Sequence, residues 1–140
     1  MKIEKIGSFQ SVVNKINKKE KGMSSFLLDT AFLLNSKIQR RVQKQGLDSN
    51  GRKMGRYQKR YSIYKSSTGR QTKFRDLTFD GTMWQSLTAV KTGTNKVEMF
   101  FGGAEEKAKA LGNDKRKPFF SLAPTEQAFL QKELEGFAKL

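Results

Sequence analysis

The side chains that most often carry out acid–base or metal chemistry are few in this sequence, and they are scattered. The chain has no histidine and no cysteine, so the commonest general base, the commonest transition-metal ligand and the reactive thiol are all missing. The acidic residues that lie close together are Glu105 with Glu106 and Glu133 with Glu135, and neither pair has a glycine-rich or apolar setting that would raise a carboxyl pKa. We interpret them as helix-surface charge and predict a protein that is not an enzyme and uses no cofactor or metal.

One glycine pair has the position of a phosphate-binding turn. Gly102 and Gly103 follow a predicted strand and precede a predicted helix, but neither the P-loop pattern nor the dinucleotide-binding pattern is present. A strand-to-helix connection that needs a positive φ accounts for the pair without a ligand.

Positive charge is concentrated in the middle of the chain. The net charge is +15, and residues 37–75 contain thirteen Lys and Arg against the single acidic residue Asp48. Such a concentration predicts an anionic partner. The cations alternate with all three tyrosines, which suits phosphates and base stacking in a nucleic acid, although the same segment could dock on an acidic protein surface or stay solvated. The candidate contact residues are Arg40, Arg41, Lys44, Arg52, Lys53, Arg56, Tyr57, Lys59, Arg60, Tyr61, Tyr64, Lys65, Arg70, Lys73 and Arg75.

The length of 140 residues predicts a single domain. No stretch is as long and apolar as a membrane span, and the start of the chain lacks the apolar region of a signal peptide, so we expect no membrane association and synthesis in the cytoplasm.

A long amphipathic helix is the strongest structural signal. Ser24 or Ser25 is the predicted N-cap, and the helix should end near Gln45. Its apolar residues step by four and three along one face and are Leu27, Ala31, Leu34, Ile38 and Val42. Before it, residues 1–22 are predicted to be an arm or a short helix beginning after Ser8.

Periodicity disappears between residues 46 and 74, where we predict an extended basic loop. A connection of this length is unusual in a compact domain and tends to be functional. Tyr57, Tyr61 and Tyr64 follow one another at spacings of four and three, so a short helix could carry them on one face.

The remaining chain predicts a hairpin followed by two helices. Two β-branched and aromatic runs, 86–91 and 96–101, are joined by a turn-forming stretch. A helix is expected over 104–111, followed by a charged turn. The last helix should begin at Pro124, with Glu126 near its positive end.

Two short stretches resemble motifs of a known group. Leu77 to Leu87 is similar to a leucine, glycine, apolar and serine pattern of the tail-completion and virion-morphogenesis proteins of tailed phages, which are often called gp10-like head-to-tail joining proteins. Arg116 to Leu122 is similar to the arginine, proline and phenylalanine element that precedes the last helix in that group, and Pro124 then begins that helix.

The resemblance implies a structural virion protein of the neck or tail. We expect an α+β fold, with a small, mainly antiparallel sheet packed by the long helix and the C-terminal helix. Copies would form a homo-oligomeric ring, sixfold by expectation and twelvefold as the alternative, between portal-side, neck or tail-tube proteins. The basic loop would contact those neighbours or DNA in the lumen. A nucleic-acid-binding accessory protein that uses residues 37–75 is the alternative function.

Overall fold

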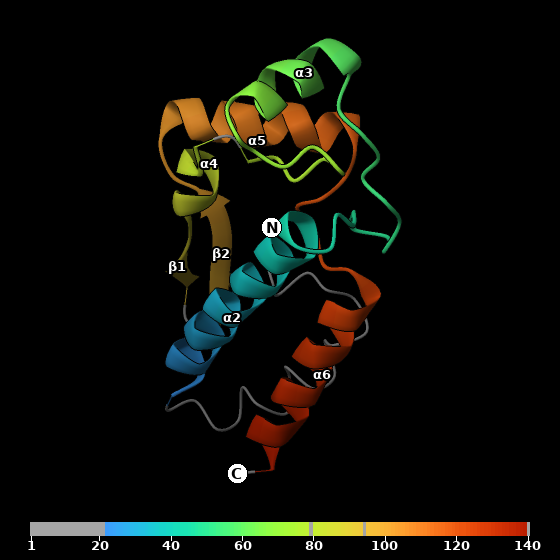
Figure 1. The fold of residues 1–140 in the computed structure, drawn as a ribbon. Coiled ribbons are helices and arrows are strands. Elements are labelled where there is room, and N and C mark those ends of the chain that lie inside the picture. The colour runs from blue at the N-terminus through green and yellow to red at the C-terminus, as the bar shows by residue number, and fades with distance from the viewer. Residues whose placement is uncertain (1–21, 79, 94, 140) are drawn as a thin grey trace.

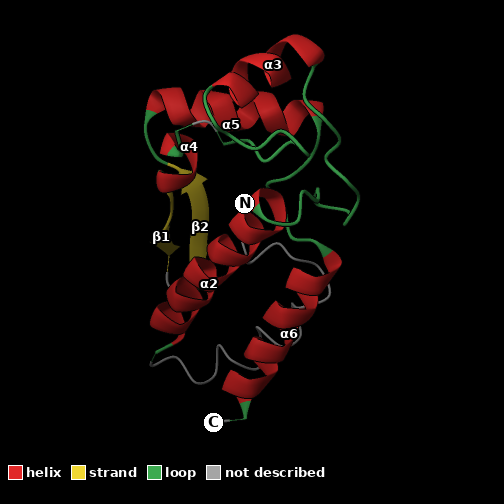
Figure 2. Ribbon diagram, viewed as in Figure 1, coloured by secondary structure: helices red, strands yellow, loops and turns green. Residues whose placement is uncertain are grey.

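A computed structural model describes residues 22–78, 80–93 and 95–139 of the chain. The helix expected after Ser8 lies outside these residues. The elements are α2 (Met23–Gln43), α3 (Lys59–Ser67), α4 (Thr82–Gln85), β1 (Leu87–Gly93), β2 (Lys96–Phe101), α5 (Ala104–Arg116) and α6 (Pro124–Ala138). Figure 1 and Figure 2 show the two strands and α6 on either side of the long helix α2, with α3 and α5 beyond one end of it. Helices together with an antiparallel sheet confirm the predicted α+β class.

Helix α2 is the central element, and its predicted apolar face is confirmed. All five of its predicted apolar residues are buried, and they form part of one continuous core. The predicted serine caps are wrong, because the helix already begins at Met23. Gly22 precedes it with a φ of 91°, a conformation that costs glycine little, and accepts the N–H of Phe26 at 2.9 Å.

The hairpin forms one two-stranded antiparallel sheet against α2. Leu87 pairs with Phe101 and Ala89 with Met99, so the inward-facing residues alternate along each strand. The predicted inner face of β2 is confirmed, because its apolar residues Val97, Met99 and Phe101 are buried. Helix α2 contacts both strands, and α6 lies on the side of α2 away from them (Figure 1).

Aromatic rings close the core where α4, β2 and the segment before α6 meet. The rings of Trp84 and Phe119 lie 5.7 Å apart in an edge-on arrangement, and those of Phe101 and Phe120 lie 4.8 Å apart. Edge-on aromatic pairs contribute beyond the apolar area that they bury. The indole of Trp84 also donates to the carbonyl of Asp76 at 3.3 Å, which anchors the preceding segment to the core.

A buried ion pair connects α2 to the start of α6. Arg41 Nη1 lies 3.2 Å from Glu126 Oε1, and the guanidinium also donates to the backbone carbonyls of Phe119 and Ser121. Glu126 accepts the N–H of Ala123 at 3.0 Å as well, so it caps its own helix. Arg41 is therefore a structural cation, and its predicted role as a surface contact residue is wrong.

Helix α5 is longer than predicted, because the expected charged turn after residue 111 is helical. Asn113 donates its side-chain amide to the carbonyl of Lys109 at 2.9 Å. The carboxylate of Asp114 accepts the N–H groups of Phe119 and Phe120 at 2.9 Å each, so it holds the chain that leaves the helix. The polar residues that favour a turn thus fix the exit of a helix here.

Residues 46–74 combine turns, an isolated bridge and the short helix α3. An isolated bridge joins Leu47 to Lys53, and Met54 is buried in the core. Helix α3 carries Tyr61 and Tyr64 as expected, whereas Tyr57 precedes the helix. The segment is therefore connected to the rest of the fold at several points.

Candidate functional site

A buried polar network holds α3 in place. Lys65 Nζ lies 2.6 Å from Asp76 Oδ1, and this lysine is the one buried residue of α3. The hydroxyl of Tyr57 donates to the same carboxylate at 2.8 Å and accepts the N–H of Leu77 at 2.9 Å. Gln71 donates to the second oxygen of Asp76 at 2.7 Å. Every group in this network has a partner, which a buried charge requires.

The network shifts two proton equilibria in opposite directions. Burial alone would raise the pKa of Asp76, but hydrogen bonds from Gln71, Lys65, Tyr57 and the N–H of Thr78 together hold that pKa below its ordinary value. Burial raises the pKa of Tyr57, and the hydrogen bond to Asp76 and its negative charge raise it further. These directions favour an ionised Asp76 beside a neutral Tyr57, which keeps the hydrogen bonds of the network in place.

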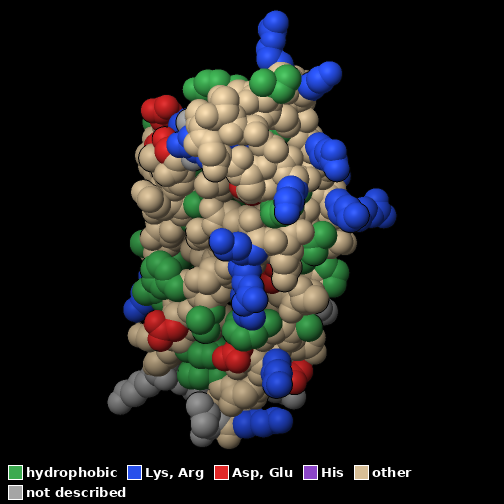
Figure 3. All heavy atoms as spheres, in the orientation of Figure 1, with side chains coloured by type: hydrophobic (Ala, Val, Ile, Leu, Met, Phe, Trp, Pro, Cys, Tyr) green, Lys and Arg blue, Asp and Glu red, His purple; other side chains and the backbone are tan. Residues whose placement is uncertain are grey.

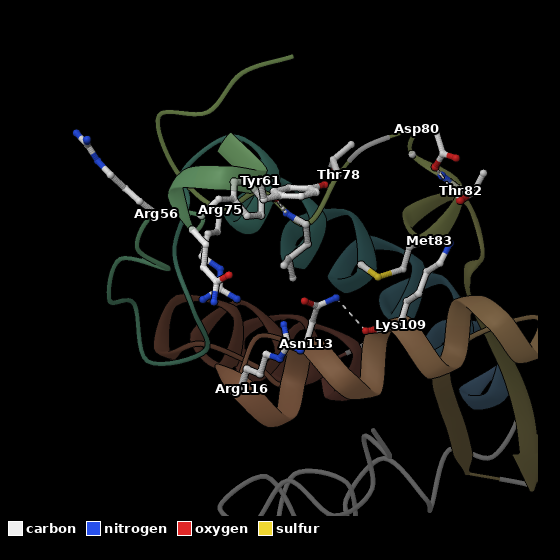
Figure 4. A pocket seen from close by; sticks show the side chains of 14 residues that line it. Arg56, Tyr61, Arg75, Thr78, Asp80, Thr82, Met83, Lys109, Asn113 and Arg116 are labelled. Carbon is white, nitrogen blue, oxygen red and sulfur yellow. Dashed lines mark hydrogen bonds between the residues drawn. The ribbon is translucent and has the colours of Figure 1, made fainter. Parts of the chain in front are cut away.

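Next to this network lies a cleft of about 660 Å³. One side of it is formed by residues 37–75, here called the basic segment, together with residues 77–78 and 80–83, and the other side is formed by α5. Figure 4 shows Arg75 and Arg116 reaching into it from these two sides, with Lys109 beyond them beside Met83. Arg56 also lines the cleft, although its side chain extends outward in this view. The remaining residues of the lining are Tyr57, Gln58, Tyr61, Leu77, Thr78, Asp80, Gly81, Thr82 and Asn113.

The arginines of the cleft have no carboxylate partner among the described residues. Arg56, Arg75 and Arg116 make no side-chain hydrogen bond or ion pair with the described part of the chain, and Lys109 contacts the exposed Glu105 at 3.4 Å. Asp76 is fully occupied by its own network. The cleft can therefore bind an anion through guanidinium groups, whose planar donors suit carboxylates and phosphates.

The structure brings together only some of the predicted contact residues. Those that line the cleft are Arg56, Tyr57, Tyr61 and Arg75. Lys65 and Arg41 are buried in ion pairs, so a surface contact role is wrong for both. The others lie elsewhere on the surface, half-buried in the case of Arg70 and exposed in the cases of Arg40, Lys44, Arg52, Lys53, Lys59, Arg60, Tyr64 and Lys73.

Sequence reasoning missed the α5 side of the cleft. Lys109, Asn113 and Arg116 are spaced by four and three residues, so they share one face of α5. That spacing was the available signal, but a charged turn was expected where the second half of the helix lies.

The outer surface repeats the charge imbalance of the sequence. Basic side chains project from much of the face shown in Figure 3, with fewer acidic ones between them. In the described ranges, no three acidic side chains come close enough together to hold a metal ion. None of the helices described is long and apolar enough to cross a membrane.

Comparisons of the chain with family models, with curated proteins and with solved structures found no match.

Proposed function

We propose that the chain is a structural component of the neck or tail terminus of a tailed phage, where copies of it form a ring that joins head to tail. The sequence resemblance supports this proposal. Its first stretch leads from Leu77 through α4 into β1, and its second contributes the buried Phe119 and Leu122 to the core. Both stretches thus have structural positions, as a joining protein without catalysis requires.

The observation that carries the proposal is the open hairpin. In the described part of the chain the sheet has two strands, so each strand has one edge without a neighbour. Open strand edges carry unpaired N–H and C=O groups and pair readily with other chains. On β1, the apolar side chain of Val90 leaves 45% of its surface exposed. Pairing of β1 in one copy with β2 in the next is a head-to-tail contact, which closes into a ring when the rotation per copy fits.

Repetition of this contact between β1 and β2 would close a ring of six copies, and a ring of twelve copies is the alternative. Portal-side, neck or tail-tube proteins would lie above and below the ring, with DNA in its lumen. In this assembly the basic segment would face those partners.

Sedimentation velocity of the purified chain tests the contact. We expect the wild type to sediment as a closed oligomer, and Val90→Lys to sediment as a monomer because a charge on an edge strand blocks pairing. The matched control is Leu111→Lys, which places the same charge on an exposed apolar position of α5 and should leave the oligomer intact. Equal sedimentation of Val90→Lys and the wild type would argue against assembly through the hairpin.

The second candidate is a nucleic-acid-binding accessory protein, and the basic cleft favours it. Such a protein would be a monomer or dimer, and its DNA affinity would fall steeply with salt. A joining subunit would instead form a ring and bind free DNA weakly. Measuring the oligomeric state and the salt dependence of DNA binding on one preparation separates these two functions.

A further inference from the structure

We propose that the cleft between the basic segment and α5 binds an acidic peptide segment of a neighbouring protein, one that carries carboxylates together with an apolar side chain. The inference rests on the proposed function only for the source of that neighbour. Binding itself needs one folded copy, so it can be measured apart from ring assembly.

Two arginines face the cleft without a carboxylate partner among the described residues. Arg75 is half-buried and Arg116 is exposed, so both guanidinium groups are open to an anion that enters the cleft. Arg116 reaches the same space from α5, more than forty residues later in the sequence. Of the nearby carboxylates, Asp76 is engaged by Lys65, so it has no free capacity for either arginine. An external anion would complete the site.

The other residues of the cleft lining indicate the chemical class of the anion. Leu77 and Met83 add apolar surface to the lining, and Leu77 is held there with a φ of 54°, which is rare for a residue other than glycine. Asp80 lies on the same lining and would repel a continuous chain of phosphates. A peptide can place one carboxylate on the arginines and an apolar side chain on Leu77, whereas a nucleic acid carries a phosphate on every nucleotide and would bring negative charge toward Asp80.

The dimensions of the cleft agree with a short peptide segment. Its volume of about 660 Å³ lies in the range of pockets that enclose small ligands, which excludes a nucleic-acid duplex from the interior. A second copy of this chain is a poor source for the segment, because its stretch of alternating glutamate and leucine, Glu133 to Glu135, is part of α6 and its Leu134 is buried. The partner is therefore a different, acidic protein.

Fluorescence anisotropy with a labelled peptide of alternating glutamate and leucine tests the proposal, with an oligothymidylate of equal charge as the second probe. We expect the peptide to bind more tightly than the oligonucleotide. The double variant Arg75→Gln with Arg116→Gln should lose about tenfold or more of the peptide affinity, since hydrogen bonds to charged groups contribute on this scale.

The matched control is Arg52→Gln with Arg60→Gln, which removes the same charge from exposed positions outside the cleft. An equal loss in the two double variants would overturn the proposal in favour of unspecific charge attraction. Tighter binding of the oligonucleotide, lost in the cleft variant, would overturn it in favour of a nucleic-acid site. Lys109→Gln provides an independent test, because it changes an exposed residue of the lining and should weaken peptide binding without affecting the fold. Peptide binding by a chain that never forms a ring would contradict the proposed function and leave this inference standing.

Discussion

Helices α2 and α3 bury opposite kinds of side chain. Helix α2 presents Leu34 and Ile38 to the core with no exposed surface, and most of its buried residues are apolar, with Arg41 buried in an ion pair near its end. Helix α3 buries Lys65 completely and leaves 63% of Ile63 exposed. Helix α2 is thus held mainly by an apolar face, whereas α3 is held by a single cation in a polar network.

The difference predicts two kinds of stability in one domain. Apolar burial is distributed over many contacts, so the core should unfold cooperatively. A polar network depends on a few directed contacts, and losing one partner leaves the others buried without compensation. We therefore expect α3 and the loops beside it to open locally at a lower free energy than the core.

The largest expected effect comes from breaking the core. Phe119→Ala removes a fully buried ring that contacts Trp84 and Phe101, and should lower the free energy of unfolding by about 3–5 kcal/mol. Chemical denaturation followed by circular dichroism measures the change. Phe32→Ala is the control, since that ring is 46% exposed on α2 and its loss should cost far less. Similar losses in the two variants would mean that the aromatic cluster is not the core.

The next effect should be confined to the basic segment. Lys65→Met leaves Asp76 buried without its cation, and we expect the free energy of local opening to fall by about 3 kcal/mol. Hydrogen exchange should then show faster exchange of the α3 amides while the α2 amides change little. Lys59→Met, at an exposed position of the same helix, should leave both unchanged. Equal acceleration in α2 and α3 would show that the two regions unfold as one.

A smaller effect is expected where the two regions join. Gly46 has a φ of 64°, and a Cβ there would lie 2.6 Å from the ring of Phe74. Gly46→Ala should therefore cost about 1–3 kcal/mol, measured by thermal unfolding. Gly51→Ala has a similar positive φ of 77° but open space around it, so it should cost less. A cost at Gly46 no larger than at Gly51 would remove the steric argument.

The smallest effect should appear only at extremes of pH. The pKa of Asp76 is lowered from 3.8, so its stabilising contribution is present above that value and is lost as the pH falls through the folded pKa. The pKa of Tyr57 is raised from 10.0, so its contribution is present below that value and is lost as the pH rises beyond it. The rate of proteolysis within α3, measured as a function of pH in the wild type and in Tyr57→Phe, gives the acidic and the alkaline pH at which the network is lost. An alkaline limit that is identical in Tyr57→Phe would contradict the second assignment.

The sequence predicted the elements that are held by apolar packing. The spacing of Leu27, Leu34 and Val42 reports directly which face of α2 is buried, and the alternation of Val97 and Met99 does the same for β2. These patterns can be read locally, because the spacing of apolar residues along a helix or a strand determines which of its faces is buried. The helix boundaries were less accurate, since Asn113 and Asp114 favour turns in sequence but support a helix and its exit here.

The cleft could be predicted only in part. Arg56 and Arg75 stood out as positive charge, but a charge count does not say which cations are used internally, so Lys65 and Arg41 were grouped with them. Arg116 was missed because Arg75, which lies across the cleft from it, is far away in the sequence. Only the fold brings such residues together, and no period in the sequence reports it.

Electron microscopy of the purified chain tests the proposed function most directly. We expect class averages of closed rings with a single copy number, six by the first expectation, and loss of these rings in Val90→Lys. Single subunits or dimers at every concentration, or filaments that never close, would contradict a ring-forming joint.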